Sequence, residues 1–564
     1  MNAELLLEHY ERIAEAPDAI ARLRRFILDL AVRGKLVEQD PNDEPACELL
    51  KRIAVEKARL VRVGQIKKPR ELDAGSDILA QFAIPSSWQW QRLDAVGAII
   101  GGGTPSAADA ENFAEPGDGI PWLTPADLGG YTELYISRGA RDLSEKGSRS
   151  SSASIMPAGT VLFTSRAPIG YVAISANPIS TNQGFKSIVP YIPECSRFIA
   201  LAMKAFAPEI DAKAPGTTFK EVSGKIVAAV PFPLPPLPEQ HRIVAKVDEL
   251  MALCDQLEAA HTECEVGRDK LTLSTMAKLN EPDPQTFADD ARFALEHLEK
   301  LTKRTDQIKQ LRQTILNLAV RGKLVAQDPS DEPAILLIKE LAADRGDGEL
   351  RHSKVLANAP FAPPSGWLWT SMSGILGPSR DISYGVIKLG PEPKSGGIPT
   401  LRCSDVRPGY IDLSGVRKVD PSIEGEYART RLEGGEILIN IRGTLGGVAH
   451  VPAHLSGYNV AREVAVIPIS QRTSGQFMVY LLLSSFFWDM IQGNLRGIAY
   501  KGLNLGILRE FPIPIPPIAE QHRIVAKVDE IMSLCAQLEL NLADGEQSRS
   551  RLLEAVLHEA LQAA

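Results

Sequence analysis

The sequence has few cysteines, no long hydrophobic run and no secretion signal. The six cysteines are widely spaced: Cys47, Cys195, Cys254, Cys264, Cys403 and Cys535. None of them forms the C-x-x-C pairs of a structural zinc site, so we expect reduced thiols and no bound metal. No apolar run approaches the about twenty residues that cross a membrane, and the acidic start MNAELLLEHYERIAEAPD lacks a signal-peptide pattern. These absences predict a cytoplasmic protein that does not contact a membrane.

The sequence also lacks an excess of positive charge. Its formal net charge is −8, from 62 basic and 70 acidic residues. A protein that binds nucleic acid alone usually has a basic surface, because contacts with phosphates supply much of its affinity. Any role on nucleic acid must therefore depend on local basic patches or on a partner that brings positive charge.

The chain repeats parts of its own sequence. EQHRIVAKVDE occupies Glu239–Glu249 and returns unchanged at Glu520–Glu530. LAVRGKLV occurs at Leu30–Val37 and again at Leu318–Val325, and a similar segment containing DEPA follows each copy. Shorter landmarks also recur in the same order: FAIPSSWQW and FAPPSGWLW, GIPWLTPADL and GIPTLRCSDV, PAGTVLFTSR and EGGEILINIR. The order indicates two equivalent domains and their connectors, rather than a solenoid, which needs at least three short units.

The two halves are not equally similar along their length. The connectors match almost residue for residue, whereas residues 88–233 and 367–512 share only scattered landmarks. The first of these inserts has a small excess of acidic residues and the second a small excess of basic ones. A common framework that carries two divergent inserts predicts one shared partner and two different recognition targets.

Apolar spacing predicts long helices in the connectors. The apolar residues of each copy are three or four positions apart: Ile243, Val247, Leu250, Cys254 and Leu257 in the first, and Ile524, Val528, Ile531, Cys535 and Leu538 in the second. The first seam predicts a helix over about 239–280, which EPDPQTFADD breaks with two prolines. Another seam follows: Leu301, Ile308, Leu311, Ile315 and Leu318. We expect a long antiparallel hairpin that ends at VRGKL, where Gly322 suits a helix C-cap.

The chain ends contain matching halves of such a hairpin. The first seventy residues hold only a returning helix, predicted at Leu23–Leu36, and the last segment holds only an outgoing one, predicted at Glu520–Leu561. Each helix alone would expose an apolar stripe. We therefore expect the two ends to pack together, which gives the chain a circular layout with a pseudo-two-fold axis.

With these features the chain resembles the specificity subunit of type I restriction–modification enzymes. The resemblance covers essentially the whole chain and depends on the duplicated EQHRIVAKVDE, on LAVRGKL with its DEPA tail, on GGGTPS near the start of the first insert, and on the layout. It implies an α+β fold with two mixed α/β target recognition domains joined by long antiparallel coiled-coil hairpins. The implied regions are a helical segment at 1–70, recognition domains at 71–233 and 346–513, a hairpin at 234–345 and a helix at 514–564.

In that family each recognition domain binds half of a split, asymmetric DNA site. The helical regions set the spacing and hold two methylase subunits, and a motor–nuclease subunit joins for cleavage. The sequence contains no Asn/Asp-Pro-Pro-Tyr/Phe methylase loop, no GxxxxGK[ST] phosphate loop and no nuclease carboxylate–lysine cluster. We therefore expect a non-catalytic subunit without a cofactor, whose partners use S-adenosylmethionine, ATP and Mg. The alternatives are a stand-alone restriction or methyltransferase enzyme and a coiled-coil scaffold that binds two protein ligands.

Candidate DNA-binding residues lie in both inserts. They are polar or basic residues at glycine-rich or equivalent positions: Thr104, Ser106, Arg166 and Lys220 in the first, and Arg380, Tyr384, Lys388, Arg442 and Lys501 in the second. GGGTPS is either a simple turn or a site where backbone N–H groups approach a phosphate. Arg166 and Arg442 end equivalent strands and either contact DNA or form structural ion pairs. Lys220 and Lys501 hold matched positions ahead of the proline runs, and DNA contact is predicted for both.

Candidate partner-binding residues lie in the repeated words. They are Arg33, Lys35, His241 and Arg242 in the first copy, and Arg321, Lys323, His522 and Arg523 in the second. VRGKL is either a helix end or a methylase contact, and the two histidines either make polar contacts at a helix terminus or dock a partner. Two further pairs are expected in the core rather than at a site. These are the tryptophans of each Trp-x-Trp word, and Cys254 with Cys535.

Overall fold

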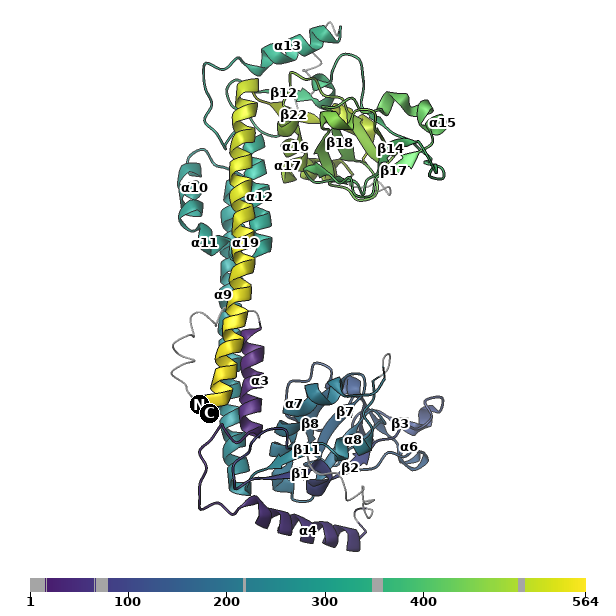
Figure 1. Cartoon of the computed structure of the whole chain (residues 1–564), viewed down its shortest axis with the longest axis vertical. Helices are drawn as coiled ribbons and strands as arrows, with labels where there is room; N and C mark the ends of the chain where they lie inside the picture. The colour runs from purple at the N-terminus through teal and green to yellow at the C-terminus, as the bar shows by residue number, and fades with distance from the viewer. Residues whose placement is uncertain are drawn as a thin grey trace. The chain divides into compact units, whose positions relative to one another are not determined.

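The computed structural model describes residues 16, 18–64, 66, 80–216, 220–346, 359–495 and 503–563 of the chain. The chain divides into two compact units. Unit 1 contains Met1–Glu263 and Glu546–Ala564, and unit 2 contains Cys264–Gly545. Each unit joins a domain with β-sheets to parts of two long helices, α9 (Leu237–Asn280) and α19 (Ile518–Ala563) (Figure 1). The α+β class expected from the sequence is therefore confirmed.

Unit 1 contains the first sheet domain. Its remaining α-helices in the described ranges are α3 (Ala19–Val32), α4 (Ala46–Arg62), α5 (Leu93–Val96), α6 (Glu145–Ser150), α7 (Ser196–Ala212) and α8 (Gly224–Ala228). Its strands are β1 (Gln89–Arg92), β2 (Gly97–Gly101), β3 (Phe113–Ala114), β4 (Ile120–Leu123), β5 (Tyr135–Ile136), β6 (Arg141–Leu143), β7 (Val161–Ser165), β8 (Ile169–Ser175), β9 (Ser180–Thr181), β10 (Lys186–Pro190) and β11 (Pro231–Leu234). They form sheets of order β2-β10-β7-β8-β5, β3-β6-β4-β9 and β1-β11.

Unit 2 repeats this plan. Where the structure describes this unit, its remaining α-helices are α10 (Phe287–Glu296), α11 (Leu298–Leu301), α12 (Thr305–Val320), α13 (Ala334–Asp344), α15 (Pro421–Glu424), α16 (Gly475–Leu483), α17 (Ser485–Leu495) and α18 (Leu505–Glu510). Its strands are β12 (Leu368–Ser371), β13 (Ser383–Tyr384), β14 (Ile398–Leu401), β15 (Val406–Arg407), β16 (Tyr410–Ile411), β17 (Arg417–Val419), β18 (Ile437–Asn440), β19 (Val448–His450), β20 (Asn459–Val460), β21 (Val464–Ile467) and β22 (Pro512–Ile515). The sheet orders are β13-β21-β18-β19, β17-β14-β20, β15-β16 and β12-β22.

One strand in each domain is buried on both of its faces. In β7, Val161 and Phe163 pack into one apolar cluster and Leu162 into another. In β18, Ile437 and Ile439 likewise pack on one side and Leu438 on the other. Because side chains alternate along a strand, the apolar words TVLF and EILI suit a strand with a core on each face. These two strands end at the loops that carry Arg166 and Arg442.

The Trp-x-Trp words lie where β1 and β12 begin. Trp88, Trp367 and Trp369 are buried, which confirms the expected core packing, whereas Trp90 is half-buried. The strand register is the same in both domains, because Trp90 pairs with Pro233 and Trp369 with Pro514. The proline words before the long helices are therefore short strands rather than plain linkers.

The connector helices pair differently from the expected hairpin. Arg304, which precedes α12, contacts Asp269 of α9 at 2.7 Å, and Asn317 near the end of α12 bonds to Asn280 at 2.8 Å. The two helices therefore run in the same direction. The reason is that α10 and α11 lead the chain back along α9 before α12 starts, with Leu301 of α11 accepting a hydrogen bond from Thr272. The segment expected to be a simple break thus includes the start of α10.

Antiparallel pairing does occur, but between other helices. Arg24 of α3 contacts Glu258 of α9 at 2.7 Å, and apolar residues nearer the end of α3 pack with the start of α9. In unit 2, Arg312 of α12 contacts Glu539 of α19 at 3.0 Å in the equivalent way. Antiparallel packing thus joins α3 to α9 and α12 to α19. These are not the helix pairs that the sequence analysis expected to be antiparallel.

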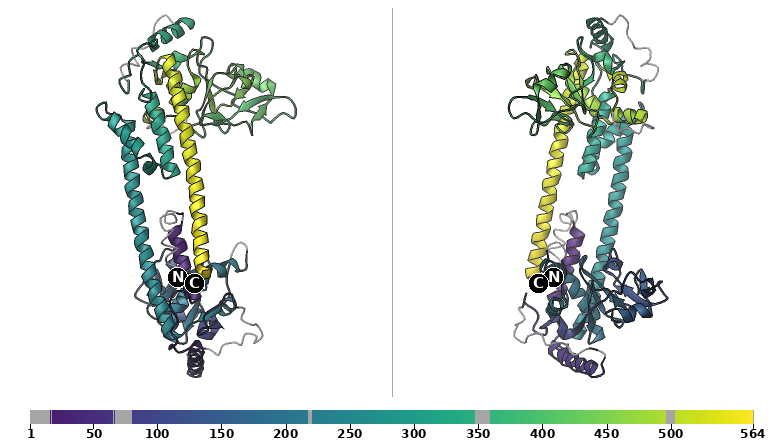
Figure 2. Two further views of the ribbon diagram at one scale, coloured as in Figure 1. Left: turned by 60° about the vertical axis from the view of Figure 1, so that its left-hand side comes forward. Right: turned by 90° about the vertical axis from the view of Figure 1, so that its right-hand side faces the viewer.

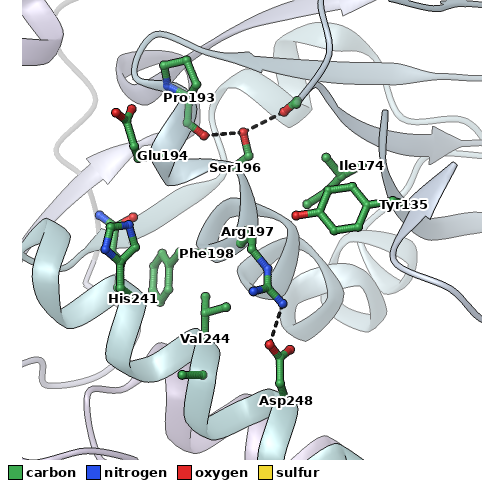
Figure 3. A pocket seen from close by; sticks show the side chains of 13 residues that line it. Tyr135, Ile174, Pro193, Glu194, Ser196, Arg197, Phe198, His241, Val244 and Asp248 are labelled. Atoms are coloured by element: carbon green, nitrogen blue, oxygen red, sulfur yellow. Dashed lines mark hydrogen bonds and ion pairs between the residues drawn. The ribbon is translucent and has the colours of Figure 1, made fainter. Parts of the chain in front are cut away.

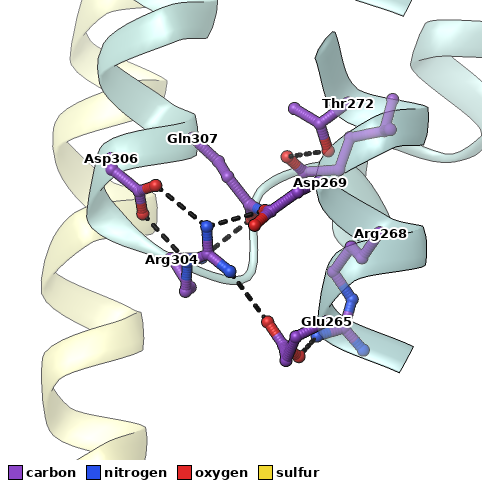
Figure 4. A network of polar contacts seen from close by, with 8 residues as sticks. Glu265, Arg268, Asp269, Thr272, Arg304, Asp306 and Gln307 are labelled. Atoms are coloured by element: carbon purple, nitrogen blue, oxygen red, sulfur yellow. Dashed lines mark hydrogen bonds and ion pairs between the residues drawn. The ribbon is translucent and has the colours of Figure 1, made fainter. Parts of the chain in front are cut away.

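A polar network fixes the start of α12 against α9 (Figure 4). The Arg304 guanidinium contacts Glu265 at 2.9 Å, Asp269 at 2.7 Å and Asp306 at 2.9 Å. Gln307 also donates to Asp269 at 3.1 Å. These contacts fix the register between the two helices, because one arginine bridges carboxylates from both of them.

The two ends of the chain pack together in unit 1, as the sequence predicts, but their contacts follow the same order along both segments. The ends therefore run in the same direction, and the expectation that they form the two halves of an antiparallel hairpin is wrong. Phe26 and Leu30 of α3 form an apolar cluster with Ala560 of α19, and Lys35 donates to the Leu561 carbonyl at 2.8 Å. Arg22 donates to the Ser550 carbonyl at 3.3 Å. Figure 2 shows α3 beside the last part of α19 in both views. Neither end therefore exposes its whole apolar stripe.

Two helices were not expected from the sequence. α4 and α13 follow the two DEPA words, so the first seventy residues contain more than one helix. Their buried residues have helical spacing: Ala46, Leu49 and Ile53 in α4, and Ala334, Ile338 and Leu341 in α13. Pro45 and Pro333 precede the first helical residues, which is a common signal for a helix start.

The apolar seams are largely buried. Ile243, Val247 and Cys254 of the first connector and Ile524, Val528 and Cys535 of the second are in the core, which confirms the expected burial of both cysteines. The exception is Leu257, which is 38% exposed. None of the helices in the described ranges is both long and apolar enough to span a membrane.

Candidate nucleic-acid interface

The repeated EQHR word attaches each sheet domain to its long helix. The Glu239 carboxylate accepts hydrogen bonds from the Trp88 indole at 2.9 Å and from the Gln39 side chain at 2.6 Å. The second copy repeats this set: Glu520 with Trp367 at 2.9 Å and Gln327 at 3.2 Å. We call each set a Trp–Glu anchor. It explains why glutamate and tryptophan recur together, since each supplies a buried partner for the other.

Burial changes the pKa of the glutamate in each anchor. Loss of solvent raises the pKa of Glu239 above its ordinary value, although the bonds from Trp88 and Gln39 oppose this shift. The pKa of Glu520 is raised for the same reason. The two anchors therefore match in electrostatics as well as in geometry.

The arginine of each EQHR motif also forms an ion pair within the chain. Arg242 makes a two-bond contact with Asp43, at 3.2 and 2.7 Å, and Arg523 does the same with Asp331, at 3.1 and 2.5 Å. Both aspartates are 8% exposed. These arginines hold the DEPA segment against the long helix. Partner binding by Arg242 and Arg523 remains a prediction. Any such binding involves side chains that also form these internal ion pairs.

The VRGKL words lie against the same anchors. The Arg33 guanidinium lies 4.3 Å from the centre of the Phe82 ring, and Arg321 lies 5.6 Å from the ring of Phe361. Burial lowers the pKa of Arg321. Lys35 is bonded to Leu561, as described above, whereas Lys323 is exposed and has no side-chain partner in the described part of the chain. The helix-end interpretation of VRGKL is thus supported for its arginines, and Lys323 stays available to a partner.

The histidines of the repeated word point to the surface. His241 and His522 are both exposed. His241 lines a cavity of about 470 Å³ between α9 and the sheet domain of unit 1, close to the 2.6 Å contact between Arg197 and Asp248 (Figure 3). Neither histidine has a side-chain partner in the described ranges, so both are available for the partner docking predicted for them.

The first sheet domain gathers four loops by backbone hydrogen bonds. The Asn182 N–H, after β9, donates to the Leu123 carbonyl at 2.8 Å, and the N–H of Ser165, the last residue of β7, donates to the Gly184 carbonyl at 2.7 Å. The Val222 N–H then donates to Ser165 at 2.9 Å. We call this set of bonds the loop frame. It brings the ends of LTPADL, TSRAP, TNQGF and KEVSG together.

The second domain contains the same loop frame. The Ala461 N–H donates to Leu401 at 2.8 Å, the Ile441 N–H to Glu463 at 2.8 Å, and the Leu503 N–H to Ile441 at 2.9 Å. A side-chain cap is shared as well, because Asp127 accepts from the Thr124 N–H at 2.6 Å and Asp405 from the Arg402 N–H at 2.8 Å. These bonds define which residues are equivalent where the sequences have diverged.

In the first domain the predicted DNA-binding cations have internal partners. Arg166 lies 3.8 Å from Glu221, and Lys220 donates to the Asp211 carbonyl at 3.1 Å. Arg166 and Lys220 both line a cleft of about 930 Å³ beside the loop frame. The structure therefore brings these two predicted residues together, although their charges are partly neutralised.

GGGTPS begins with the last residue of β2 and continues as a loop that packs against the frame. A Cβ at Gly102 would lie 2.0 Å from the Asn182 carbonyl, so the glycine permits a close approach within the chain. The Thr104 hydroxyl donates to the Gln183 amide oxygen, and Ser106 is exposed. Thr104 is thus placed to position Gln183, and Ser106 is free to meet a ligand.

In the second domain the basic residues are less neutralised. Arg442, Arg462 and Lys388 are exposed and have no side-chain partner in the described ranges. They are neighbours through the backbone, because the Arg462 N–H donates to Val386 at 2.9 Å and the Arg442 N–H donates to Glu463 at 3.3 Å. This group forms a local basic patch of the kind that the net charge requires.

The other residues predicted in this domain lie differently. The Arg380 guanidinium contacts Glu436 at 2.7 Å and the Arg431 carbonyl at 3.0 Å, which gives it a structural role. Tyr384 is half-buried in β13, where it packs against the core. Lys501 lies outside the described residues. DNA contact by these three residues remains a prediction.

Sequence reasoning missed Gln183 and Arg462. Both are exposed and hold equivalent positions between two bonds of the loop frame. The words TNQGF and NVARE share no pattern, so only their positions after β9 and β20 relate them. Lys186 was also missed, and it contacts Glu221 at 3.5 Å. No group of three or more His, Cys, Asp or Glu residues in the described ranges could hold a metal ion.

Two equivalent sheet domains with one loop frame and different exposed side chains define a protein with two recognition domains. A family model described as the type I restriction modification DNA specificity domain matches residues 85–266 and again residues 387–543. These matches cover more than half of the chain. The chain therefore belongs to the family of type I restriction–modification DNA specificity subunits.

Individual relatives are similar over different lengths. The type I restriction enzyme EcoAI specificity subunit of Escherichia coli is 28% identical over 569 residues, which is 96% of this chain and 94% of that protein. The MjaIX specificity subunit of Methanocaldococcus jannaschii is 41% identical over 162 residues, or 28% of this chain and 37% of that protein. The solved HsdS subunit from Thermoanaerobacter tengcongensis has a TM-score of 0.40 and 20% identity, over 85% of this chain and 98% of that one.

Proposed function

We propose that each recognition domain binds one half of a bipartite, asymmetric DNA site and so directs adenine methylation or cleavage by partner subunits. The observation that carries this proposal is the loop frame. Both domains have the same backbone bonds, but the exposed side chains on them differ. Two copies of one frame with unlike side chains suit two unlike half-sites.

Contacts with phosphates and with bases would come from different residues of the frame. Arg166 and Arg442 are the same residue type, and each follows the strand of its domain that is buried on both faces. A cation that both domains share suits phosphate contact, which positions a protein without selecting sequence. Ser106, Lys220, Lys388 and Lys501 are further candidates for this role. Base recognition would fall to residues that differ between the domains.

The partners that we propose are two methylase subunits and one motor–nuclease subunit. Catalysis, with S-adenosylmethionine, ATP and Mg, belongs to them rather than to this chain. The exposed His241, His522 and Lys323 support docking at the repeated words, since they have no internal partner in the described ranges. A partner that surrounds the DNA would also supply positive charge, which offsets the net charge of −8.

An exchange of one insert tests this proposal. Residues 88–233 are replaced by the corresponding insert of another family member, the chain is expressed with its methylase, and the methylated adenines are mapped by single-molecule sequencing. We expect one half of the methylated motif to change and the other to stay. The proposal fails if both halves change, or if neither changes while the assembly still methylates DNA.

A further inference from the structure

The loop frame singles out one exposed position in each domain. In the first domain, Asn182 is fixed by its N–H bond to Leu123, and Gly184 is fixed because its carbonyl accepts from Ser165. The residue between them is Gln183, which is exposed. A side chain whose two backbone neighbours are both bonded is presented with little freedom, as a base-recognising group requires.

The equivalent position in the second domain is Arg462. Its neighbour Ala461 donates to Leu401 at 2.8 Å, and the carbonyl of Glu463 accepts from Ile441 at 2.8 Å. The Arg462 N–H also donates to Val386 at 2.9 Å, so the backbone of this residue is itself fixed. The guanidinium is exposed and has no partner in the described ranges.

The chemistry of the two side chains differs in a way that bases can distinguish. A guanidinium donates two parallel hydrogen bonds and matches O6 and N7 of guanine in the major groove, whereas a carboxamide donates one bond and accepts one and matches N6 and N7 of adenine. The Thr104 hydroxyl donates to the Gln183 amide oxygen, which restricts the rotation of that amide. The loop frame thus presents a side chain that matches adenine in the first domain and a side chain that matches guanine in the second.

We propose that Gln183 and Arg462 are specificity-determining residues, which recognise an A·T pair in one half-site and a G·C pair in the other. This inference rests on the proposed function, because it assumes that the loop frames face DNA. The inference assigns a different role to Arg442, which lies beside Arg462. The equivalent of Arg442 in the first domain is Arg166, so this position has the same residue type in both domains. Arg442 contacts a phosphate and carries no sequence preference.

Alanine substitution of Arg462 tests the assignment. The full chain with Arg462→Ala is expressed with its methylase, and the methylated motif is compared with those of the natural chain and of Arg442→Ala. We expect Arg462→Ala to relax one G·C position in one half-site, with a loss of discrimination of about fivefold to 150-fold, because a good two-bond contact contributes about 1–3 kcal/mol. The other half-site stays unchanged. Arg442→Ala lowers methylation at all sites and leaves the motif as it is.

Gln183→Ala supplies the reciprocal test. We expect it to relax one A·T position in the half-site that Arg462→Ala leaves intact. The inference is overturned if Arg462→Ala keeps the full motif, or if it weakens all sites evenly as Arg442→Ala does. The exchange of residues 88–233 described above tests the proposed function independently, so it shows whether the assignment of these two residues or the proposed function itself has failed. If the exchange changes half of the motif and Arg462→Ala does not, only the assignment of these two residues is wrong.

Discussion

The two recognition domains have the same framework and differ on the surface that it presents. Their Trp–Glu anchors, arginine–aspartate contacts and loop frames agree bond for bond. Around the frame, however, Arg166 of the first domain lies near Glu221, whereas Arg442 of the second has no side-chain partner in the described ranges. Backbone bonds and buried anchors tolerate little change, and exposed side chains on them can diverge without loss of the fold.

The largest expected effect comes from a substitution that breaks one anchor and leaves the other intact. Gly34 has a φ of +69°, and a Cβ there would lie 2.5 Å from Pro85, next to Trp88. Gly34→Ala should therefore destabilise unit 1 by about 3 kcal/mol, from a disfavoured backbone conformation and a steric overlap. Hydrogen exchange measured on peptides from both units should show faster exchange in unit 1 only.

Gly64 provides the matched control for this substitution. Its φ is +73°, but a Cβ there would have no neighbour within 4 Å. Gly64→Ala should lower the free energy of unfolding by only about 1 kcal/mol, because it has the disfavoured backbone conformation without the steric overlap. Gly322→Ala should reproduce the large effect in unit 2, where the Cβ would lie 2.5 Å from Pro364. Equal exchange in both units after Gly34→Ala would mean that the anchors do not stabilise the units separately.

An intermediate effect is expected on DNA affinity. Arg442→Ala removes a cation without an internal partner, so the slope of log affinity against log salt should become shallower by about one phosphate contact, or about 0.9. Arg166→Ala should change the slope less, because Arg166 lies 3.8 Å from Glu221. The assembly with methylase is titrated with its DNA at several salt concentrations. A larger slope change for Arg166→Ala would reverse the comparison between the domains.

The smallest expected effect is on the pH dependence of folding stability, and it should be similar in both units. The pKa of Glu239 is raised above its ordinary value of 4.5, mainly by burial. The folded chain therefore holds this proton more tightly than the unfolded chain, and stability falls as the pH rises from about 4.5 through the raised pKa. Glu239→Gln cannot ionise and should flatten this part of the stability curve for unit 1, measured by urea unfolding.

Glu38→Gln is a suitable control for the pH experiment, because Glu38 is exposed and has no side-chain partner in the described ranges. It should leave the curve unchanged. Glu520→Gln should flatten the curve for unit 2 in the way that Glu239→Gln does for unit 1. An unchanged curve for both anchor variants would show that the glutamates are not the groups that titrate.

Much of the fold could be predicted from the repeats and from apolar spacing. The seam from Ile243 to Cys254 gives a helix because side chains three and four residues apart share a face, and α9 spans Leu237–Asn280. Packing of the chain ends also follows from the sequence, because a lone apolar stripe needs a partner. The direction of α12 did not follow, since the return path through α10 and α11 depends on tertiary contacts such as that of Leu301 with Thr272.

The candidate site could be predicted only where the two halves still resemble each other. Arg166 and Arg442 follow similar strands, so sequence comparison relates them. Gln183 and Arg462 lie in unrelated words, and only backbone bonds to Leu123 and Leu401 reveal that their positions are equivalent. The internal contacts of Arg380 were not predictable either, because Glu436 is distant in sequence and comes close only through the sheet.

The most direct test of the central claim is the methylated motif of the natural chain. DNA exposed to the complete assembly is sequenced by a single-molecule method that detects methylated adenines. Two unlike surfaces on equivalent frames predict a motif of two specified parts that differ in sequence and are separated by unspecified bases. A palindromic motif, or one continuous specified sequence, would contradict the account.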